Sequence, residues 1–298
     1  MRVLVTGGAG FVGSNIVDAL DARGDLVVAL DDLSTGNRQN LAPDIAFRHA
    51  SVADEKQLRA AVHGEGFDVI VHCASKTKVV ESMEKEALYR AVIVDGTRNA
   101  LDLASRVNAR WFVNLSTGGA MYGETPTCAT EHAPTHPDSN YGKFKLEAER
   151  LVEESGIPSI SLRLANVYGP RQRQDLEGGV IAIFQGKWRA KEPITVFGDG
   201  TGERDYVYVG DVADAVTSSF TGDRTGVYNI GTGVATSVNQ LIAAFTELLG
   251  PPAGVTRAPA RPVEVQRSCL DAHKAAHDGL WKPKTALKQG LRRTLELG

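Results

Sequence analysis

The chain is poor in cysteine, in long apolar runs and in excess charge, and each shortage excludes a class of protein. Its three cysteines are scattered and odd in number, which predicts neither a disulfide framework nor a zinc site. No stretch approaches the roughly 18 apolar residues that span a bilayer. Since the formal net charge is only −3, a basic surface for nucleic acid or membranes is not expected.

The remaining composition is that of an ordinary globular protein. Hydrophobic residues make up 42% and charged residues 23% of 298 positions, enough for a large core in one domain or in two closely joined domains. The first residues enter a strand directly, so no signal peptide is expected. These features predict a cytoplasmic, enzyme-sized protein.

The first 32 residues carry the most informative pattern. An apolar run at residues 3–5 is followed by TGGAGFVG, by a helix-like spacing of apolar residues, and by a second apolar run at residues 26–30. Strand, glycine turn, helix and strand in this order form the unit that binds a dinucleotide. The glycines permit a tight turn and let main-chain N–H groups approach a pyrophosphate at the start of the helix.

An acidic pair, Asp31 and Asp32, closes this unit. A carboxylate at the end of the second strand accepts hydrogen bonds from the adenosine ribose and repels a 2′-phosphate. Arg38 could pair with such a phosphate, but the two acids stand closer to the end of the second strand. The sequence therefore predicts NAD as the cofactor and not NADP.

Strand-like and helix-like segments alternate well beyond the first unit, which predicts an α/β protein with a doubly wound parallel sheet of the Rossmann type. The predicted strands are residues 45–47, 69–73, 111–115, 159–164, 205–209 and 226–230. The predicted helices are residues 54–62, 85–106, 141–155, 180–188 and 285–297.

The texture of the sequence changes at Asn166, where glycine, arginine and polar residues become frequent. We therefore expect an NAD-binding domain over residues 1–165 and about 205–235. A smaller α/β lobe for the substrate would cover residues 166–204 and about 236–298. The cleft should lie at the carboxyl ends of the parallel strands.

Two segments at those strand ends carry reactive groups. Ser116 and Thr117 end one predicted strand, and Tyr141 and Lys145 lie one turn apart at the start of a predicted helix, so they share a face. An ammonium beside a phenol favours the phenolate and lowers a pKa that is ordinarily about 10. We expect Tyr141 to act as a general base, assisted by Lys145.

At this point the sequence resembles the extended short-chain dehydrogenases/reductases, specifically the nucleotide-sugar epimerases that are similar to UDP-glucose 4-epimerase. The resemblance covers nearly the whole chain. It is carried by TGGAGFVG, LDDLSTGNRQNL, VIVHCAS, STGGAMYGE, YGKFK, LRLANVYGPRQ, VFGDGTGERDYVYVGDVADA, VYNIGTG and RPVEVQRSCLD.

The resemblance assigns roles to individual residues. Tyr141 would be the base, Lys145 its partner and Thr117 the hydroxyl that assists it, with Ser116 the second choice. The implied partner is a UDP-hexose, and a homodimer would form through residues 85–106 and 141–155; no metal is implied. The cofactor residues would be Gly7, Gly10, Phe11, Val12, Gly13, Asp31, Asp32, Ser34, Thr35, Gly36, Ser51, Val52, Cys73, Ala74, Ser75, Tyr141 and Lys145. The substrate residues would be Ser116, Thr117, Asn166, Phe197, Arg204, Arg261 and Glu264.

Some positions depart from the family pattern. Ser51 stands where a carboxylate usually accepts the adenine amine, which predicts weaker or differently held adenine. Lys76 and Lys78 follow the strand at residues 69–73 and would face the sugar end of the cleft. They would suit an anionic hexose, although solvated loop lysines are the simpler interpretation.

The residues after Thr117 separate the possible reactions. Relatives that dehydrate or decarboxylate a 4-keto sugar have a carboxylate there, whereas this chain has Gly118 and Gly119. Epimerisation at C4 is therefore favoured. A UDP-glucuronate-type epimerase or decarboxylase and a 4-keto-sugar reductase stay open as alternatives. A non-catalytic NAD-binding regulator would not need the Tyr141–Lys145 pair.

Overall fold

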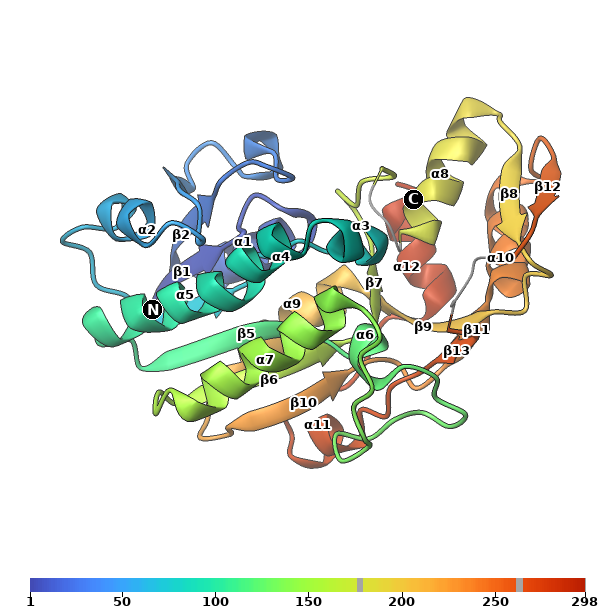
Figure 1. Cartoon of the computed structure of the whole chain (residues 1–298). Coiled ribbons are helices and arrows are strands. Elements are labelled where there is room, and N and C mark those ends of the chain that lie inside the picture. Colours follow the sequence, from blue (N-terminus) through green and yellow to red (C-terminus); the bar gives the residue numbers. More distant parts are fainter. Residues whose placement is uncertain (176–178, 261–264, 298) are drawn as a thin grey trace.

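A sheet of seven parallel strands forms the centre of the larger part of the molecule (Figure 1). The computed structural model describes residues 1–175, 179–260 and 265–297. The strand order is β10-β6-β5-β4-β1-β2-β3, and Val3 of β1 pairs with Val27 on one side and Val69 on the other. This confirms the predicted Rossmann-type sheet. The strands are β1 (Arg2–Thr6), β2 (Leu26–Asp31), β3 (Ala46–His49), β4 (Val69–His72), β5 (Trp111–Thr117), β6 (Ser159–Leu164) and β10 (Gly226–Ile230).

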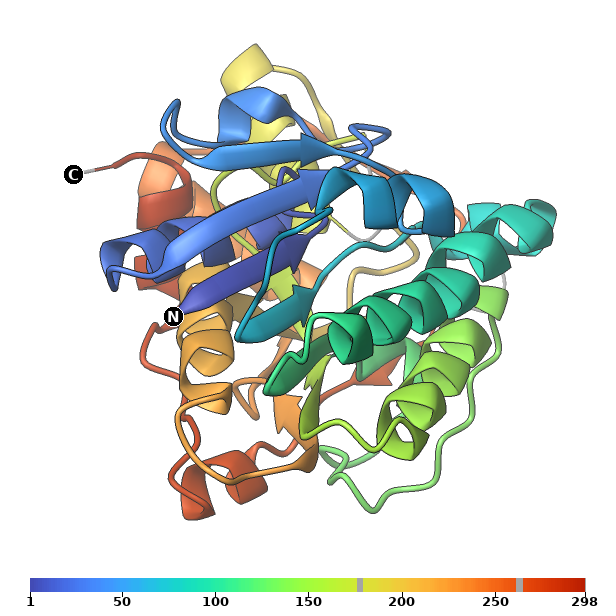
Figure 2. The same cartoon turned by 90° about the vertical axis from the view of Figure 1, so that its left-hand side faces the viewer.

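Helices cover both faces of this sheet (Figure 2). Successive strand side chains point to opposite faces, so Val3 and Val5 pack in one core cluster and Leu4 in the other. The first cluster includes side chains of α1 (Phe11–Ala22) and α9 (Val209–Ser219). The second includes side chains of α2 (Glu55–Ala61), α5 (Gly96–Arg106) and α7 (Asn140–Glu154). Both faces are therefore apolar, as a parallel sheet requires.

The single helix predicted at residues 85–106 is wrong in detail. The structure has α3 (Val79–Glu84), α4 (Glu86–Arg90), a π-helical segment (Ala91–Asp95) and α5. The Thr97 hydroxyl donates to the carbonyl of Ile93 and also contacts the ring of buried His72. Thr97 thus connects the π-helical segment to β4, and single π turns often lie near functional sites.

A smaller lobe packs beyond the carboxyl edge of the large sheet (Figure 1). Its core gathers Phe184, Leu241, Phe245 and Leu291. Its strands are β7 (Asn166–Tyr168), β8 (Ile194–Phe197), β9 (Glu203–Tyr208), β11 (Ala235–Ser237), β12 (Val255–Ala258) and β13 (Arg267–Ser268). Its helices are α8 (Val180–Ala190), α10 (Val238–Leu249) and α12 (Leu287–Thr294), and short helices elsewhere are η1 (Arg38–Asn40), α6 (Gly119–Tyr122) and α11 (His273–His277).

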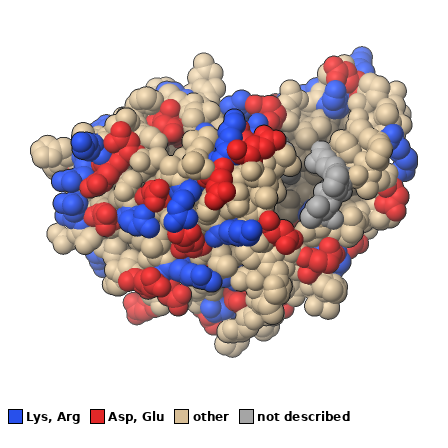
Figure 3. Space-filling model, viewed as in Figure 1, with Lys and Arg blue, Asp and Glu red and all other residues tan. Residues whose placement is uncertain are grey.

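The surface mixes both signs of charge, as the net charge of −3 leads one to expect (Figure 3). Within the described ranges, none of the helices combines the length and the apolar character that a bilayer crossing needs. Nor do three His, Cys, Asp or Glu side chains of those ranges gather so as to hold a metal ion.

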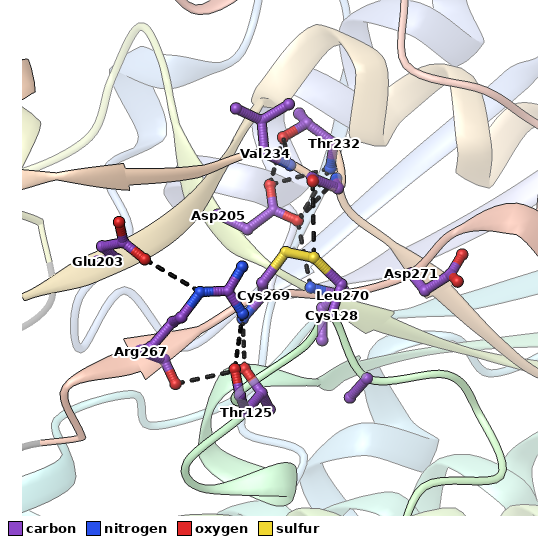
Figure 4. The surroundings of a disulfide bond; sticks show 12 residues. Thr125, Cys128, Glu203, Asp205, Thr232, Val234, Arg267, Cys269, Leu270 and Asp271 are labelled. Atoms are coloured by element: carbon purple, nitrogen blue, oxygen red, sulfur yellow. Dashed lines mark hydrogen bonds and ion pairs between the residues drawn. A yellow bond between two sulfur atoms is a disulfide. The ribbon is translucent and has the colours of Figure 1, made fainter.

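A disulfide joins Cys128 to Cys269, contrary to the prediction from the cysteine count (Figure 4). The two cysteines are 141 residues apart in sequence, so only the tertiary fold brings them together. The surrounding main chain is paired as well, because the N–H of Cys269 donates to the Thr125 hydroxyl and that of Ala129 to the carbonyl of Cys269. The bond thus fixes a loop after β5 to the segment that follows β13.

Replacing both cysteines, Cys128→Ser with Cys269→Ser, should lower the free energy of unfolding by about 2–4 kcal/mol, because the cross-link restricts the unfolded chain. Urea unfolding measures the difference. A reducing agent should lower the midpoint of the oxidised wild type and leave that of the double variant unchanged. Identical wild-type midpoints with and without reductant would contradict the disulfide.

Candidate active site

The glycine turn brings the start of α1 close to the end of β1. Gly7 has a φ of +67°, which favours glycine. A Cβ on Gly13 would lie 2.1 Å from the carbonyl oxygen of Gly7, so only glycine permits this contact. In the described first turn of α1 no side chain caps the helix and no acid stands there. Its N–H groups are therefore suited to an anionic phosphate.

A groove begins at this turn and runs along the carboxyl edge of the sheet. Most of the residues predicted to hold the cofactor line it. They are Gly7, Gly10, Phe11, Val12, Gly13, Asp31, Asp32, Ser34, Thr35, Val52, Cys73, Ala74 and Ser75. Gly36 packs on the Asp31 carboxylate, and Ser51 lies behind Asp32. An uncapped helix start and a carboxylate pair in one groove fit NAD, the phosphates at the helix and the ribose at the acids.

The two acids at the end of β2 differ in their surroundings. The carboxylate of Asp31 accepts hydrogen bonds from the N–H groups of Ala9, at 3.0 Å, and Leu33, at 2.8 Å. Burial raises its pKa. Burial acts in the same direction on the pKa of Asp32, but hydrogen bonds from Ser34 and the charge of Lys76 hold it below its ordinary value. Asp32 is thus the more firmly ionised acid.

Lys76 lies at the adenosine end of the groove, so the expectation that it faces the sugar is wrong. Its ammonium donates to the hydroxyl of Ser34, at 3.0 Å, and its side chain lines the groove. The loop after β4 therefore bends toward the loop after β2. Lys78 is the residue before α3, and its charge acts on Asp175. Neither position could be read from the sequence, because both depend on the path of this loop.

The predicted reactive residues meet where β5 ends and α7 begins. The Thr117 hydroxyl lies near the phenol of Tyr141 and acts to lower the pKa of that phenol. The N–H of Tyr141 donates to the hydroxyl of Ser82, at 3.1 Å, and Ser139 caps α7 by accepting from the N–H of Gly142. The cap fixes where α7 starts. The start of α7 is therefore fixed against α3 through the main chain of Tyr141.

Lys145 is buried one turn along α7, and its ammonium donates to the carbonyl of Leu115, at 2.8 Å. Burial lowers the pKa of Lys145 to about 8 and raises the pKa of Tyr141 to about 12. The pKa of Tyr141 thus stands above its ordinary value and not below it, because burial is the largest influence on it. The reason is that desolvation disfavours both charged forms.

A buried polar network behind Lys145 was missed in the sequence. Arg163 of β6 contacts Glu149 of α7 through two nitrogens and donates to the hydroxyl of Tyr122. The Tyr122 hydroxyl in turn donates to Asn229 of β10. Glu149 stands four residues after Lys145, a spacing that could have suggested a shared face. The network fixes α7 to the sheet, and the charge of Glu149 favours the ammonium of Lys145.

The residues predicted to bind the substrate lie on several different elements of the structure. Thr117 lies at the reactive centre, whereas the buried hydroxyl of Ser116 has no hydrogen-bond partner among the described residues. The Asn166 side chain lies close to Gly119, and Arg204 pairs through its main chain with Ser268. Phe197 is 42% exposed at the end of β8. Arg261 and Glu264 lie outside the described residues.

The segment that the disulfide fixes packs against Gly118, next to Thr117. A Cβ on Gly118 would lie 2.5 Å from the side chain of Leu270, so Leu270 occupies the space beside Thr117. Asp205 accepts hydrogen bonds from the N–H groups of Thr232, at 2.9 Å, and Leu270, at 3.4 Å. These contacts hold Leu270 in place from β9.

The sheet, the glycine turn and the groove define a dinucleotide-binding enzyme of the Rossmann type, and comparison with known proteins gives the family. Residues 3–231 match the NAD-dependent epimerase/dehydratase family, to which this chain belongs. A UDP-glucose 4-epimerase of Mycolicibacterium smegmatis is 36% identical over 309 residues, which cover 99% of this chain and 98% of that protein.

Two solved structures are also similar over nearly the whole chain. The UDP-glucose 4-epimerase of Thermotoga maritima, crystallised with UDP-glucose, has a TM-score of 0.95 at 38% identity and covers 99% of this chain and 98% of its own. The UDP-glucose 4-epimerase of Thermus thermophilus, in complex with NAD, has a TM-score of 0.94 at 37% identity, with the same coverage. The resemblance found in the sequence is confirmed.

The lowered pKa of Lys145 predicts a titration near pH 8, far below the ordinary 10.5. NMR of lysines labelled at the ε-carbon measures it, and Lys145→Met identifies the signal by removing it. Because the folded state holds this proton less tightly than the unfolded chain, Lys145 alone makes folding more favourable as the pH rises from about 8 to 10.5. A midpoint near 10.5 would contradict its burial.

Proposed function

We propose that the protein interconverts UDP-glucose and UDP-galactose by inverting the configuration at C4 of the hexose. The observation that carries the proposal is the meeting of Thr117 and Tyr141 at the end of β5, one helical turn from buried Lys145. It lies at the carboxyl edge of the same sheet as the cofactor groove. UDP-glucose 4-epimerases among the relatives and neighbouring structures support the choice of reaction.

NAD, held in the groove, would supply the hydride acceptor and donor for the sugar carbon. The chain's own residues orient the substrate and move the proton. The N–H groups at the start of α1 hold the phosphates, and Asp31 meets the adenosine ribose. Cys73, Ala74 and Ser75 border the groove toward the reactive centre.

Tyr141 takes the proton of the C4 hydroxyl and later returns it, while Thr117 donates a hydrogen bond that steadies the sugar oxygen. A base with a pKa of about 12 is almost wholly protonated at neutral pH. The phenol must therefore be activated in the complete site, where positive charge near the phenol favours the phenolate. Lys145 is the cation that this chain supplies there.

The 4-keto hexose must rotate and present its other face before the hydride returns. The nucleotide therefore needs firm anchoring, whereas the sugar must be held loosely. Arg204 and Arg261 are proposed to hold the diphosphate through forked, charge-assisted bonds. Asn166 and Phe197 would contact the nucleotide, and Glu264 a ribose hydroxyl. We also propose that residues 1–165 and about 205–235 form the NAD-binding domain. Residues 166–204 and about 236–298 would form the substrate lobe.

The neighbourhood of Gly118 favours epimerisation over elimination. A dehydratase or decarboxylase needs an additional carboxyl group beside Thr117, but the side chain of Leu270 fills that place. The site can therefore oxidise and reduce C4, and it has no carboxyl group at this position for proton removal from C5. This contact is the structural reason for preferring the epimerase to the UDP-glucuronate decarboxylase.

Tyr141→Phe should reduce turnover by about 10²–10⁴-fold, because the proton acceptor is lost while the groove is unchanged. Proton NMR of purified protein with UDP-glucose, UDP-glucuronate, UDP-N-acetylglucosamine and dTDP-glucose measures C4 inversion. Tyr228→Phe is the matched control, since its hydroxyl bonds to Asp278 at the far side of β10. If Tyr141→Phe turns over substrate at the wild-type rate, Tyr141 is not the general base.

A homodimer and a cytoplasmic location are part of the same proposal. Contact through α4, α5 and α7 would cover Leu88, which is 42% exposed on α4. The ion pair between Arg90 and Glu147 joins α4 to α7 and keeps the two helices side by side.

Leu88→Asp should therefore shift the protein toward the monomer, because a charge would be buried in the contact. Light scattering after size exclusion measures the mass. Leu26→Asp is the control, as Leu26 is exposed at the start of β2, away from these helices. A wild type that is monomeric at all concentrations would contradict the dimer.

A further inference from the structure

The adenosine end of the groove still contains a hydrogen-bond acceptor, although residue 51 is a serine and not the expected carboxylate. Its hydroxyl donates to the Oδ2 atom of Asp32, at 3.3 Å. The serine therefore uses its proton to orient a carboxylate that directly follows the neighbouring strand. A carboxylate is present at this edge, supplied by the residue that follows β2 and not by the loop after β3.

The orientation of Asp32 is fixed at both oxygens. Its Oδ1 atom accepts from the N–H of Ser34, at 2.9 Å, and its Oδ2 atom accepts from Ser51. A carboxylate oxygen has two lone pairs, so Oδ2 retains capacity for a second donor. The charge of Lys76 favours the ionised form. His49 faces the main-chain carbonyl of Asp32 and leaves the carboxylate to the groove.

The groove beside Asp32 has the character of a slot for a flat apolar ring. Leu30, Ala50, Val52 and Val92 belong to one core cluster and also line the groove. The carbonyl of Val52 accepts from the side-chain amide of Asn99, at 2.8 Å, which fixes the loop after β3 against α5. Apolar side chains can hold the faces of a base, but they do not distinguish one base from another.

Asp31 is less suited to read the base. Both of its oxygens accept from main-chain N–H groups of the glycine turn and of Leu33, and only 7% of the residue is exposed. It is therefore directed at the turn and the adjoining ribose. Asp32 is the acid at the rim of the apolar slot.

We infer that Asp32, oriented by Ser51, accepts the exocyclic amino group of adenine and so makes the groove selective for NAD over dinucleotides with a 6-oxo base. The inference rests on the proposed cofactor groove. A carbonyl in place of the amine would face the carboxylate, and two acceptors repel each other. Discrimination by a charged acceptor of this kind is about tenfold or more.

The experiment measures which dinucleotide the protein retains. Purified protein is equilibrated with equal concentrations of NAD and nicotinamide hypoxanthine dinucleotide, freed of unbound nucleotide and denatured, and the released nucleotides are separated by chromatography. The wild type should retain NAD over the analogue by about tenfold or more. Asp32→Ala should bring the ratio close to one, and Ser51→Ala should lower it partly.

A rescue variant and a control make the test specific. Asp32→Ala combined with Ser51→Asp returns a carboxylate to the slot and should restore the preference for NAD. Asp102→Ala, which removes an exposed acid on α5, should leave the ratio unchanged.

Two results would overturn the inference. A wild type that retains both dinucleotides equally excludes an acceptor for the amine. If Asp32→Ala weakens the retention of both dinucleotides equally, so that the ratio of NAD to the analogue is unchanged, Asp32 binds the ribose and not the adenine amine. Retention of neither dinucleotide by the wild type would contradict the cofactor groove itself, and the inference with it.

Discussion

Close packing at the glycine turn is the constraint on which the site depends. β1 lies between β2 and β4, so the turn after β1 touches the loops that follow both neighbours. A Cβ on Gly7 would lie 2.7 Å from the main-chain nitrogen of Ala74, and the N–H of Ala9 donates to Asp31. A side chain at this turn would separate the loops from the start of α1. The groove exists because three strand ends converge on a turn in which glycine lets the main chain approach its neighbours closely.

Burial sets the chemistry of the reactive pair. Desolvation raises the pKa of Tyr141 and lowers that of Lys145, so burial favours a neutral phenol and a weakly held ammonium proton. A site of this kind needs additional positive charge before the phenol can act as a base.

The parts of the account that the sequence predicted are those with short, regular patterns. The glycine turn, the parallel strands and the Tyr141–Lys145 spacing are local, and each follows from period or from helix geometry. The Cys128–Cys269 bond joins segments 141 residues apart, and the position of Lys76 follows the path of a loop. The π-helical segment and the Arg163–Glu149 contact depend on packing between elements. Sequence spacing carries no record of such contacts.

The central claim is that one closed site removes hydrogen from C4 and returns it to the same carbon. Incubation with UDP-glucose deuterated at C4 tests this claim directly, with the product analysed by NMR and mass spectrometry. The account predicts UDP-galactose that retains the deuterium at C4 in ordinary water. Product in which solvent hydrogen has replaced the label would contradict it.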